Sequence, residues 1–239
     1  MAFSVRDFKF ELLKVFAASP RNLYKFNVLG RGDAEGDLER TLRLKFNLEE
    51  RYRAAKAFDE LRDDGLIRPT LSDMVHPEDW CEITDVGREA LRRGTLDELD
   101  AALAKINPHL LEVRRGAWSA LASNQPDSLR QAAHSARELI DQVLKEGAPD
   151  EGVKSRPWYR EDSSSKSGVT RRMRVKYLME QFKGGASDSD VAIVESACDV
   201  VLAINTKLMA QAHGRSAPPY QDVKDELETA EMALRRILI

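Results

Sequence analysis

The chain has only two cysteines, Cys81 and Cys198, and they lie far apart in its 239 residues. This scarcity excludes a disulfide framework and a cysteine-based zinc site, so both thiols are expected to be small buried groups. Aromatic residues make up only 7% of the chain. No apolar run approaches the ~18 residues that a membrane span needs, and the first residues lack a signal-peptide core. We therefore expect a cytoplasmic protein without membrane contact.

An excess of charge of one sign and the common catalytic signatures are also missing. The formal net charge is -3, so no global basic field attracts nucleic acid. The four histidines are not grouped with acids at metal-ligand spacing, and no metal site is expected. Gly30 and Gly32 lack the following Lys-Ser/Thr of a phosphate-binding loop, and no nucleophile elbow occurs. These absences predict no cofactor.

Residues 48–94 carry the most informative pattern. An amphipathic helix ends at Gly65, a short apolar hairpin follows, and a new helix begins at Thr84 or Asp85. The expected elements are helices over residues 5–18, 37–46 and 48–64, strands over 66–67 and 81–84, and a hairpin tip over 71–78. Over residues 1–94 this order resembles a winged helix-turn-helix, with three helices and a small β wing. The resemblance implies binding of nucleic acid or protein rather than chemistry.

The third expected helix of this region would be the one that reads DNA. With Tyr52, Phe58 and Leu61 facing inward, the opposite face mixes two cations with three acids: Arg53, Lys56, Glu49, Glu60 and Asp64. Arg53 and Lys56 are thus the candidate nucleic-acid contacts of this helix, but the acids beside them repel phosphates. We therefore expect this region to dock mainly to proteins, and DNA binding by a transcriptional repressor stays as an alternative.

The rest of the chain is expected to be helical, which makes the whole protein mainly α. Helices are expected over residues 96–106, 109–122, 127–145, 170–183, 187–212 and 220–238. Thr95 and Glu98 have the spacing of a capping box for the first of them. Residues 95–123 would form a helical connector, and residues 124–239 an antiparallel helical bundle. A polar loop is expected over residues 151–169.

The region from residue 154 to residue 176 is strongly basic. It holds eight Lys and Arg residues against two acids, whereas the rest of the chain is net negative. Cations displace counterions from phosphates, and exposed aromatic rings stack on unpaired bases. The candidate nucleic-acid contacts here are Arg156, Trp158, Arg160, Arg171, Arg172, Arg174 and Lys176. Equally, the region could be a loop and a solvated helix face, with Trp158 covering the helices.

Two further features suggest a family. The long helix over 187–212 is followed by His213-Gly214, a loop and a last helix, and residues 129–139 place Arg130 one turn before His134. In the first of these features residues 116–239 resemble prokaryotic HEPN-fold domains, which occur in toxin–antitoxin, abortive-infection and other phage-defence systems. Residues 129–139, followed by Val153, Trp158 and Thr170-Arg-Arg, also resemble a helical family described as predicted nucleases associated with prokaryotic PIWI proteins.

The resemblance leaves three functions open. A HEPN ribonuclease would be a metal-independent homodimeric toxin, with a histidine as acid/base and a cation holding the phosphate. The pair would be His213 with Lys207 or Arg215, or else His134 with Arg130. Active members carry an arginine about four to six residues before the final histidine, where this chain has only Lys207. This departure favours a non-enzymatic regulator or adaptor. Its partner would be RNA, DNA or a protein of the same defence operon. The third function is the DNA-binding repressor.

Overall fold

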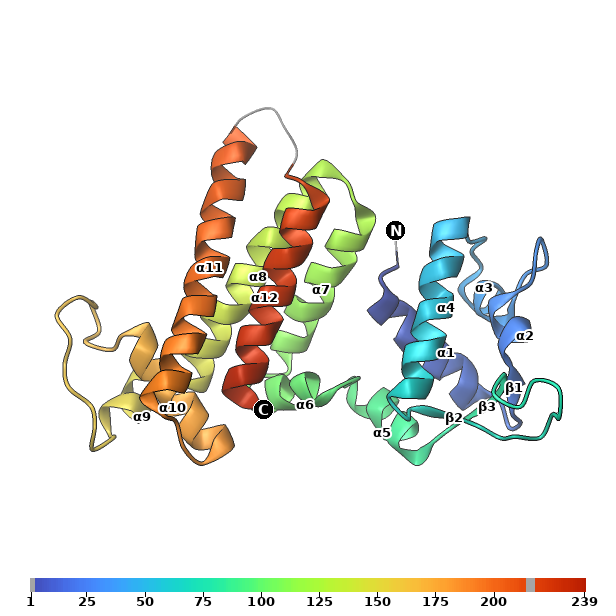
Figure 1. Cartoon of the computed structure of the whole chain (residues 1–239), viewed down its shortest axis with the longest axis horizontal. Helices are drawn as coiled ribbons and strands as arrows, with labels where there is room; N and C mark the ends of the chain where they lie inside the picture. Colours follow the sequence, from blue (N-terminus) through green and yellow to red (C-terminus); the bar gives the residue numbers. More distant parts are fainter. Residues whose placement is uncertain (1–2, 214–217) are drawn as a thin grey trace. The chain divides into compact units, whose positions relative to one another are not determined.

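The computed structural model describes residues 3–213 and 218–239, without the side chains of residues 204, 205 and 207–213. This part of the chain is mainly helical and includes one small antiparallel sheet of three strands (Figure 1). The chain divides into two compact units, Met1–Leu96 (unit 1) and Asp97–Ile239 (unit 2), and each has its own apolar core. Among the described helices, none is long and apolar enough to cross a bilayer.

Unit 1 begins its principal helices at side-chain caps. The Ser4 hydroxyl accepts a hydrogen bond from the Asp7 amide, and the Asn47 side chain accepts one from the Glu50 amide. Gly65, with φ +70°, follows the second of these helices. The elements in chain order are α1 (Val5–Ala18), β1 (Leu23–Tyr24), α2 (Lys25–Leu29), α3 (Asp37–Leu42), α4 (Leu48–Asp63), β2 (Ile67–Pro69), β3 (Trp80–Ile83) and α5 (Asp85–Arg93).

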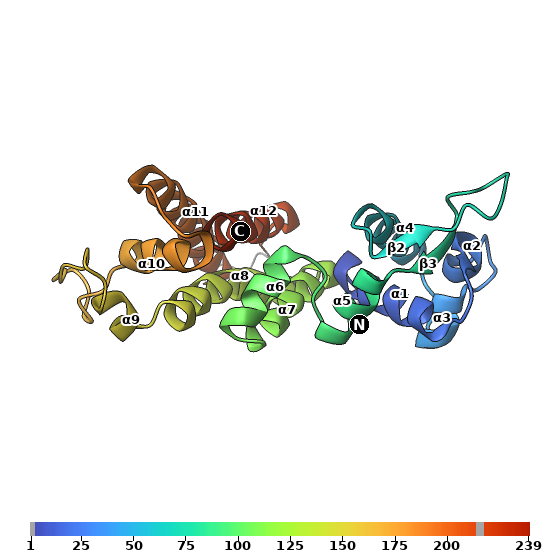
Figure 2. The same cartoon turned by 90° about the horizontal axis from the view of Figure 1, so that it is seen from below.

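The three strands form a sheet in the order β1-β3-β2, with both pairs antiparallel. Cys81 of β3 lies opposite Leu23 of β1, and Ile83 lies opposite Ile67 of β2. Cys81 and Ile83 alternate with more exposed residues, so one face of β3 joins the apolar core that α1 and α4 complete. Residues 70–79, which we call the hairpin loop, join β2 to β3 and extend away from the sheet (Figure 2).

The helix expected over residues 48–64 is present as α4, but the expected burial of Tyr52 was wrong. Tyr52 is 71% exposed, whereas Phe58 and Leu61 are fully buried. Nine residues are two and a half helical turns, so Tyr52 lies on the side of the helix opposite Leu61 and the core cannot cover both. Leu48, at the start of the helix, is 86% exposed. The exposed face of α4 is therefore more apolar than the sequence pattern indicated.

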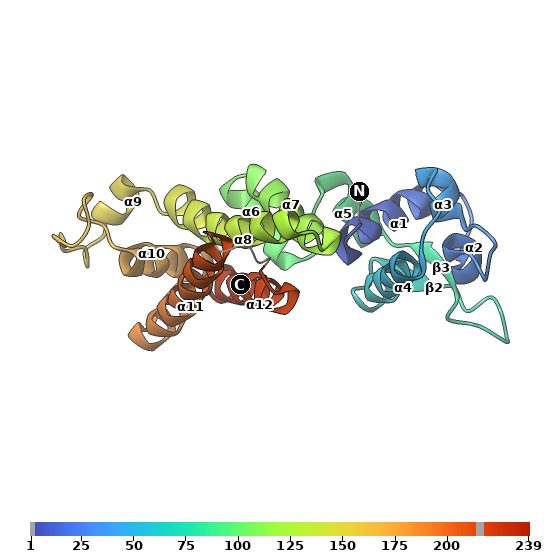
Figure 3. The same cartoon turned by 90° about the horizontal axis from the view of Figure 1, so that it is seen from above.

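Unit 2 consists of helices α6 (Glu98–Ile106), α7 (His109–Ser123), α8 (Pro126–Gly147), α9 (Asp150–Lys154), α10 (Arg171–Lys183), α11 (Asp188–His213) and α12 (Tyr220–Leu238). α7 packs along α8, while α11 and α12 pack against each other and against α8. In Figure 3, α10 lies beside α11 and α12. The apolar stripe of α8, which includes Ala132, Leu139 and Val143, is buried in this core.

Two local expectations for unit 2 need correction. The first helix does not start with the Thr95 capping box, because the Asp97 carboxylate caps it by accepting from the Asp100 amide at 2.8 Å. The negative charge of an aspartate at this position also interacts favourably with the positive end of the helix dipole. The region expected as a polar loop over residues 151–169 begins inside a short helix, α9, which buries Val153.

Candidate functional site

An arginine lies buried in unit 2. Arg114 of α7 is 2% exposed, and its Nη1 atom lies 2.7 Å from Asp100 Oδ1 and 2.8 Å from Asp97 Oδ1. Its Nε atom lies 2.7 Å from Oε1 of Glu231 on α12. One guanidinium therefore meets three carboxylates, which come from the beginning of α6 and from the middle of α12. We call these four residues the Arg114 cluster.

Two further side chains complete the hydrogen bonding of the Arg114 cluster. The indole of Trp118 donates to Glu231 Oε1 at 2.6 Å, and Arg235 donates to Asp97 Oδ2 at 2.9 Å. Burial alone would lower the pKa of Arg114, but hydrogen bonds and charge attraction from Glu231 and Asp97 raise it above its ordinary value. The guanidinium is thus permanently charged. The neighbouring carboxylates are ion-paired with cations. This arrangement suits a structural role in holding the helices together.

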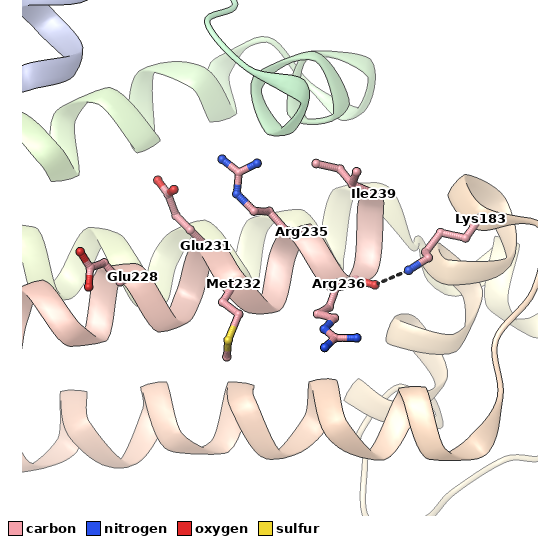
Figure 4. A pocket seen from close by; sticks show the side chains of 7 residues that line it. All are labelled: Lys183, Glu228, Glu231, Met232, Arg235, Arg236 and Ile239. Atoms are coloured by element: carbon pink, nitrogen blue, oxygen red, sulfur yellow. Dashed lines mark hydrogen bonds between the residues drawn. The ribbon is translucent and has the colours of Figure 1, made fainter. Parts of the chain in front are cut away.

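A wide, shallow pocket lies beside the Arg114 cluster on α12. Its volume is about 410 Å³, and it is lined by Lys183, Glu228, Glu231, Met232, Arg235, Arg236 and Ile239. In Figure 4, Glu231 and Arg235 point to one side of α12, while Met232 and Arg236 point toward α11. Lys183 crosses from α10 and donates to the Arg236 carbonyl at 3.2 Å. The lining mixes both charge signs, so the pocket selects neither an anion nor a cation by charge alone.

The arginines at the start of α10 are paired with carboxylates of unit 2. Arg171 lies 2.8 Å from Asp199, and Arg172 lies 2.7 Å from Glu195, both on α11. Arg174 donates to the Asp150 carboxylate and to a backbone carbonyl near α9. The structure therefore places these three predicted contacts against acids from two other segments.

The other predicted contacts of the basic region, which are Arg156, Trp158, Arg160 and Lys176, lie against aromatic rings or backbone, and Arg156 also lies 4.0 Å from Glu180. The Arg156 guanidinium lies 4.7 Å from the centre of the Tyr177 ring, and Lys176 Nζ lies 5.2 Å from the centre of the Trp158 ring. Trp158 is half-buried and packs against the core of unit 2. The exposed Arg160 donates to neighbouring backbone carbonyls. Of this group, Arg160 is the most accessible to a ligand.

The structure describes one of the two predicted catalytic pairs. His134 is exposed on α8, one turn after Arg130, whose guanidinium lies 2.7 Å from Asp127. The side chains of His213 and Lys207 and the whole of Arg215 lie outside the described residues, so the pair at the end of α11 has no geometry here. Within the part of the chain that is described, no group of three His, Cys, Asp or Glu residues is arranged to hold a metal ion.

In unit 1, Lys56 is exposed on α4 and its Nζ lies 3.7 Å from Glu60, while Arg53 is half-buried on the same helix. A stronger charge pair, which the sequence did not indicate, joins Arg51 to the fully buried Glu39 at 3.1 Å. Burial would raise the pKa of Glu39, but hydrogen bonds from the Phe46 and Gly36 amides and the charge of Arg51 lower it overall. This carboxylate fastens α3 to the segment that leads into α4.

The Arg114 cluster was missed as well, although the sequence contains a signal for it. Arg114 occurs on the same stripe of α7 as Leu110, Ala117 and Leu121, all of which are buried. A charged residue on an apolar face requires a partner in the core, because an unpaired buried charge is strongly unfavourable. Sequence alone could have flagged Arg114, but it could not have named Glu231, which lies 117 positions away.

The fold and this site define a mainly helical protein whose larger unit is tied together by a buried arginine and three carboxylates. A family model described as predicted pPIWI-associating nuclease matches residues 103–237, and the chain belongs to this family. The match confirms the resemblance to PIWI-associated predicted nucleases that the back half of the sequence indicated. No curated protein and no solved structure matches the chain.

Proposed function

We propose that this protein is a non-enzymatic regulator or adaptor in a prokaryotic defence system that involves a PIWI protein. The family description supports the link to PIWI proteins. The observation that carries the proposal is the pairing of the basic region: Arg171, Arg172 and Arg174 each contact a carboxylate of unit 2. The region that best predicted nucleic-acid binding thus has little unbalanced charge at these positions.

The acids beside these arginines disfavour nucleic-acid binding more than the ion pairs themselves do. An exposed pair contributes only ~0.2–1 kcal/mol, so an arginine could exchange its carboxylate for a phosphate at small cost. The carboxylates of Asp199 and Glu195 would stay beside the phosphate, however, and repel it. Binding of a nucleic-acid strand across α10 therefore gains less free energy than the number of cations indicates. A protein partner is favoured.

For unit 1 we propose a winged helix-turn-helix that docks to proteins. The strand order β1-β3-β2, α4 directly before β2 and the hairpin loop after β2 all support this assignment. A wing that contacts DNA needs cations for the phosphates. The hairpin loop, residues 70–79, contains neither Lys nor Arg. In α4 the exposed residues include Leu48 and Tyr52, which suit a protein surface better than a DNA groove.

A HEPN-type ribonuclease is the second candidate for unit 2, which we propose to be an antiparallel bundle of that kind. The family description favours it, and so does the exposed His134 one turn after Arg130. A histidine in this setting could exchange a proton with a ribose hydroxyl while the arginine holds the phosphate. The competing contact of Arg130 with Asp127 weakens the pair as a phosphate site.

Labelled single-stranded RNA and duplex DNA test these proposals with the full-length protein. Wild type is incubated beside His134→Ala and His213→Ala, and the products and the bound fraction are measured at two salt concentrations. The adaptor proposal predicts intact RNA and equally weak binding by all three proteins. Cleavage by wild type that disappears in one histidine variant would replace it with the ribonuclease. Tight, salt-sensitive binding of duplex DNA would favour the repressor instead.

A further inference from the structure

We infer that the hairpin loop of unit 1 is a docking element that inserts into an apolar, basic-rimmed pocket of a protein partner. This inference rests on the proposed adaptor function and names the surface that performs it. Three large apolar side chains in the loop are exposed: Leu71 at 69%, Met74 at 99% and Val75 at 77%. Since an exposed apolar group gains free energy when it leaves water, these residues favour a bound state.

The loop is held in place even though its tip is apolar and exposed. The Asp73 carboxylate accepts hydrogen bonds from the Val75 amide at 2.7 Å, the His76 amide at 3.3 Å and the Trp80 indole at 3.1 Å. At the base, the Thr70 amide donates to the Trp80 carbonyl at 2.8 Å. These bonds tie the tip to the first residue of β3, so little conformational freedom is lost when a partner binds.

A second anchor comes from the chain before β1. The Asn22 amide group donates to the Thr70 hydroxyl at 3.1 Å and to the Ser72 hydroxyl at 3.0 Å. Leu71, between these two residues, has φ +54°, a region that a leucine seldom occupies. This conformation is sustained by the bonds around it and turns the Leu71 side chain toward solvent. A loop that needed only to connect two strands would not require these features.

The charge of the loop defines the chemistry of its partner. Residues 70–79 contain Asp73, Glu78 and Asp79, and no Lys or Arg balances them within the loop. The nearest arginine in the sequence, Arg68 of β2, is already paired with Glu82 of β3 at 2.7 Å. Acids around an apolar tip fit a pocket with an apolar floor and a rim of Lys or Arg. A nucleic acid, by contrast, would be repelled.

The test measures the affinity of the full-length chain for the purified prokaryotic PIWI protein from the same genome, by calorimetry at low and physiological salt. The variant Met74→Ser/Val75→Ser removes the apolar tip and is expected to weaken binding about tenfold or more. The matched control is Val86→Ser, which changes an apolar residue of α5 that is 64% exposed and lies outside the loop, and it should change the affinity less than about twofold. Hydrogen exchange checks that the variants stay folded.

A second variant separates the shape of the loop from its composition. Asp73→Ala keeps all three apolar residues but removes the carboxylate that holds the tip, so binding should weaken by several-fold through a slower on-rate. Glu78→Lys should also weaken binding, and its effect should shrink at high salt. If all of these variants bind the PIWI protein as tightly as wild type does, the inference is overturned.

The outcomes also distinguish this inference from the adaptor proposal. If wild type binds the PIWI protein and the tip variant binds equally well, the adaptor stands and the docking surface is wrong. If wild type does not bind the PIWI protein at all, both proposals fail. Sedimentation of each protein alone covers one more case: a dimer that the tip variant dissociates would mean that the loop docks to a second copy of the chain, which overturns the proposed partner.

Discussion

Arg114 and Asp100 form an ion pair in the interior of unit 2, with 2.7 Å between Nη1 and Oδ1 and almost no solvent exposure of either residue. Removing two charges from water is expensive, and their attraction recovers this cost only when further hydrogen bonds are made. Asp97 and Glu231 supply those bonds. The Arg114 cluster therefore fixes how α6, α7 and α12 pack, more than it adds net stability.

Replacing Arg114 with methionine should destabilise unit 2 strongly. The substitution removes the cation and leaves the fully buried Asp100 without its guanidinium partner, which is expected to cost about 3–5 kcal/mol. Hydrogen exchange followed by mass spectrometry measures the change separately in each unit. Arg137→Met is the matched control, because Arg137 is half-exposed and its pair with Asp141 at 3.6 Å contributes at most ~1 kcal/mol. If the two variants lose equal stability, the Arg114 cluster contributes no more than a surface ion pair does.

Glu39→Gln should destabilise unit 1 in a pH-dependent way. The folded-state pKa of Glu39 lies below its ordinary value of 4.5, so the carboxylate stabilises the fold above that pH. At neutral pH the loss of charged hydrogen bonds to the Phe46 and Gly36 amides is expected to cost roughly 1–3 kcal/mol. Wild type loses this advantage as the pH falls through the folded-state pKa. Protection of the Phe46 amide against hydrogen exchange reports the difference.

The stabilities of wild type and Glu39→Gln should therefore converge as the pH falls. A difference between wild type and Glu39→Gln that stays constant from pH 7 down to the acid limit of folding would contradict a role for the charge. Glu49→Gln serves as the control, because Glu49 is exposed on α4 and its loss should change the stability of unit 1 by less than about 0.5 kcal/mol.

Gly87→Ala should destabilise unit 1 through a steric clash. A methyl group on Gly87 of α5 would lie 2.0 Å from the Leu66 carbonyl oxygen, so α5 would have to move away from the start of β2. Overpacking of this kind costs about 1–3 kcal/mol. Gly116→Ala is the contrast: nothing lies within 4 Å of the added methyl group on the exposed side of α7. Alanine there should stabilise the helix by up to ~1 kcal/mol in thermal or chemical unfolding.

Both cysteines should be unreactive in the native protein. Burial raises the pKa of Cys81 and of Cys198 to about 11, so almost no thiolate exists at pH 8. Ellman's reagent should find no fast thiol in the native chain and two after denaturation in guanidinium. Reaction of either thiol within seconds at pH 8 would contradict its burial. The expectation from sequence that both are small core groups is confirmed by their positions in β3 and α11.

Several helix boundaries could be read from the sequence because they depend on neighbouring residues. Thr170 accepts from the Met173 amide at the start of α10, and Gly184 ends that helix with φ +75°. Ser187 likewise accepts from the Asp190 amide before α11. Caps and glycine ends act within one turn, so the local sequence contains the information. The capping box at Thr95 failed only because Asp97 is a competing cap two residues later.

The partners of charged residues needed more than local sequence, whereas the position of Tyr52 did not. Phe58 and Leu61 were correctly expected to be buried, and the periodicity of the helix places Tyr52 on the side of α4 opposite Leu61. The sequence shows that the region over residues 154–176 is rich in cations. It did not indicate that Asp199, 28 positions after Arg171, would lie 2.8 Å from that arginine. The contact of Arg53 and Lys56 with nucleic acid stays a prediction.

The residues alone indicate a mainly helical chain, a hairpin after α4, and membership in a family of predicted PIWI-associated nucleases. These features depend on periodicity, on caps and on residue identities along the chain. The folded chain was needed to show that Arg114 is enclosed by carboxylates and that Met74 projects into solvent from a loop held by Asp73. The reason is that charge interactions and burial depend on distance in space, and folding brings together residues that the sequence keeps far apart.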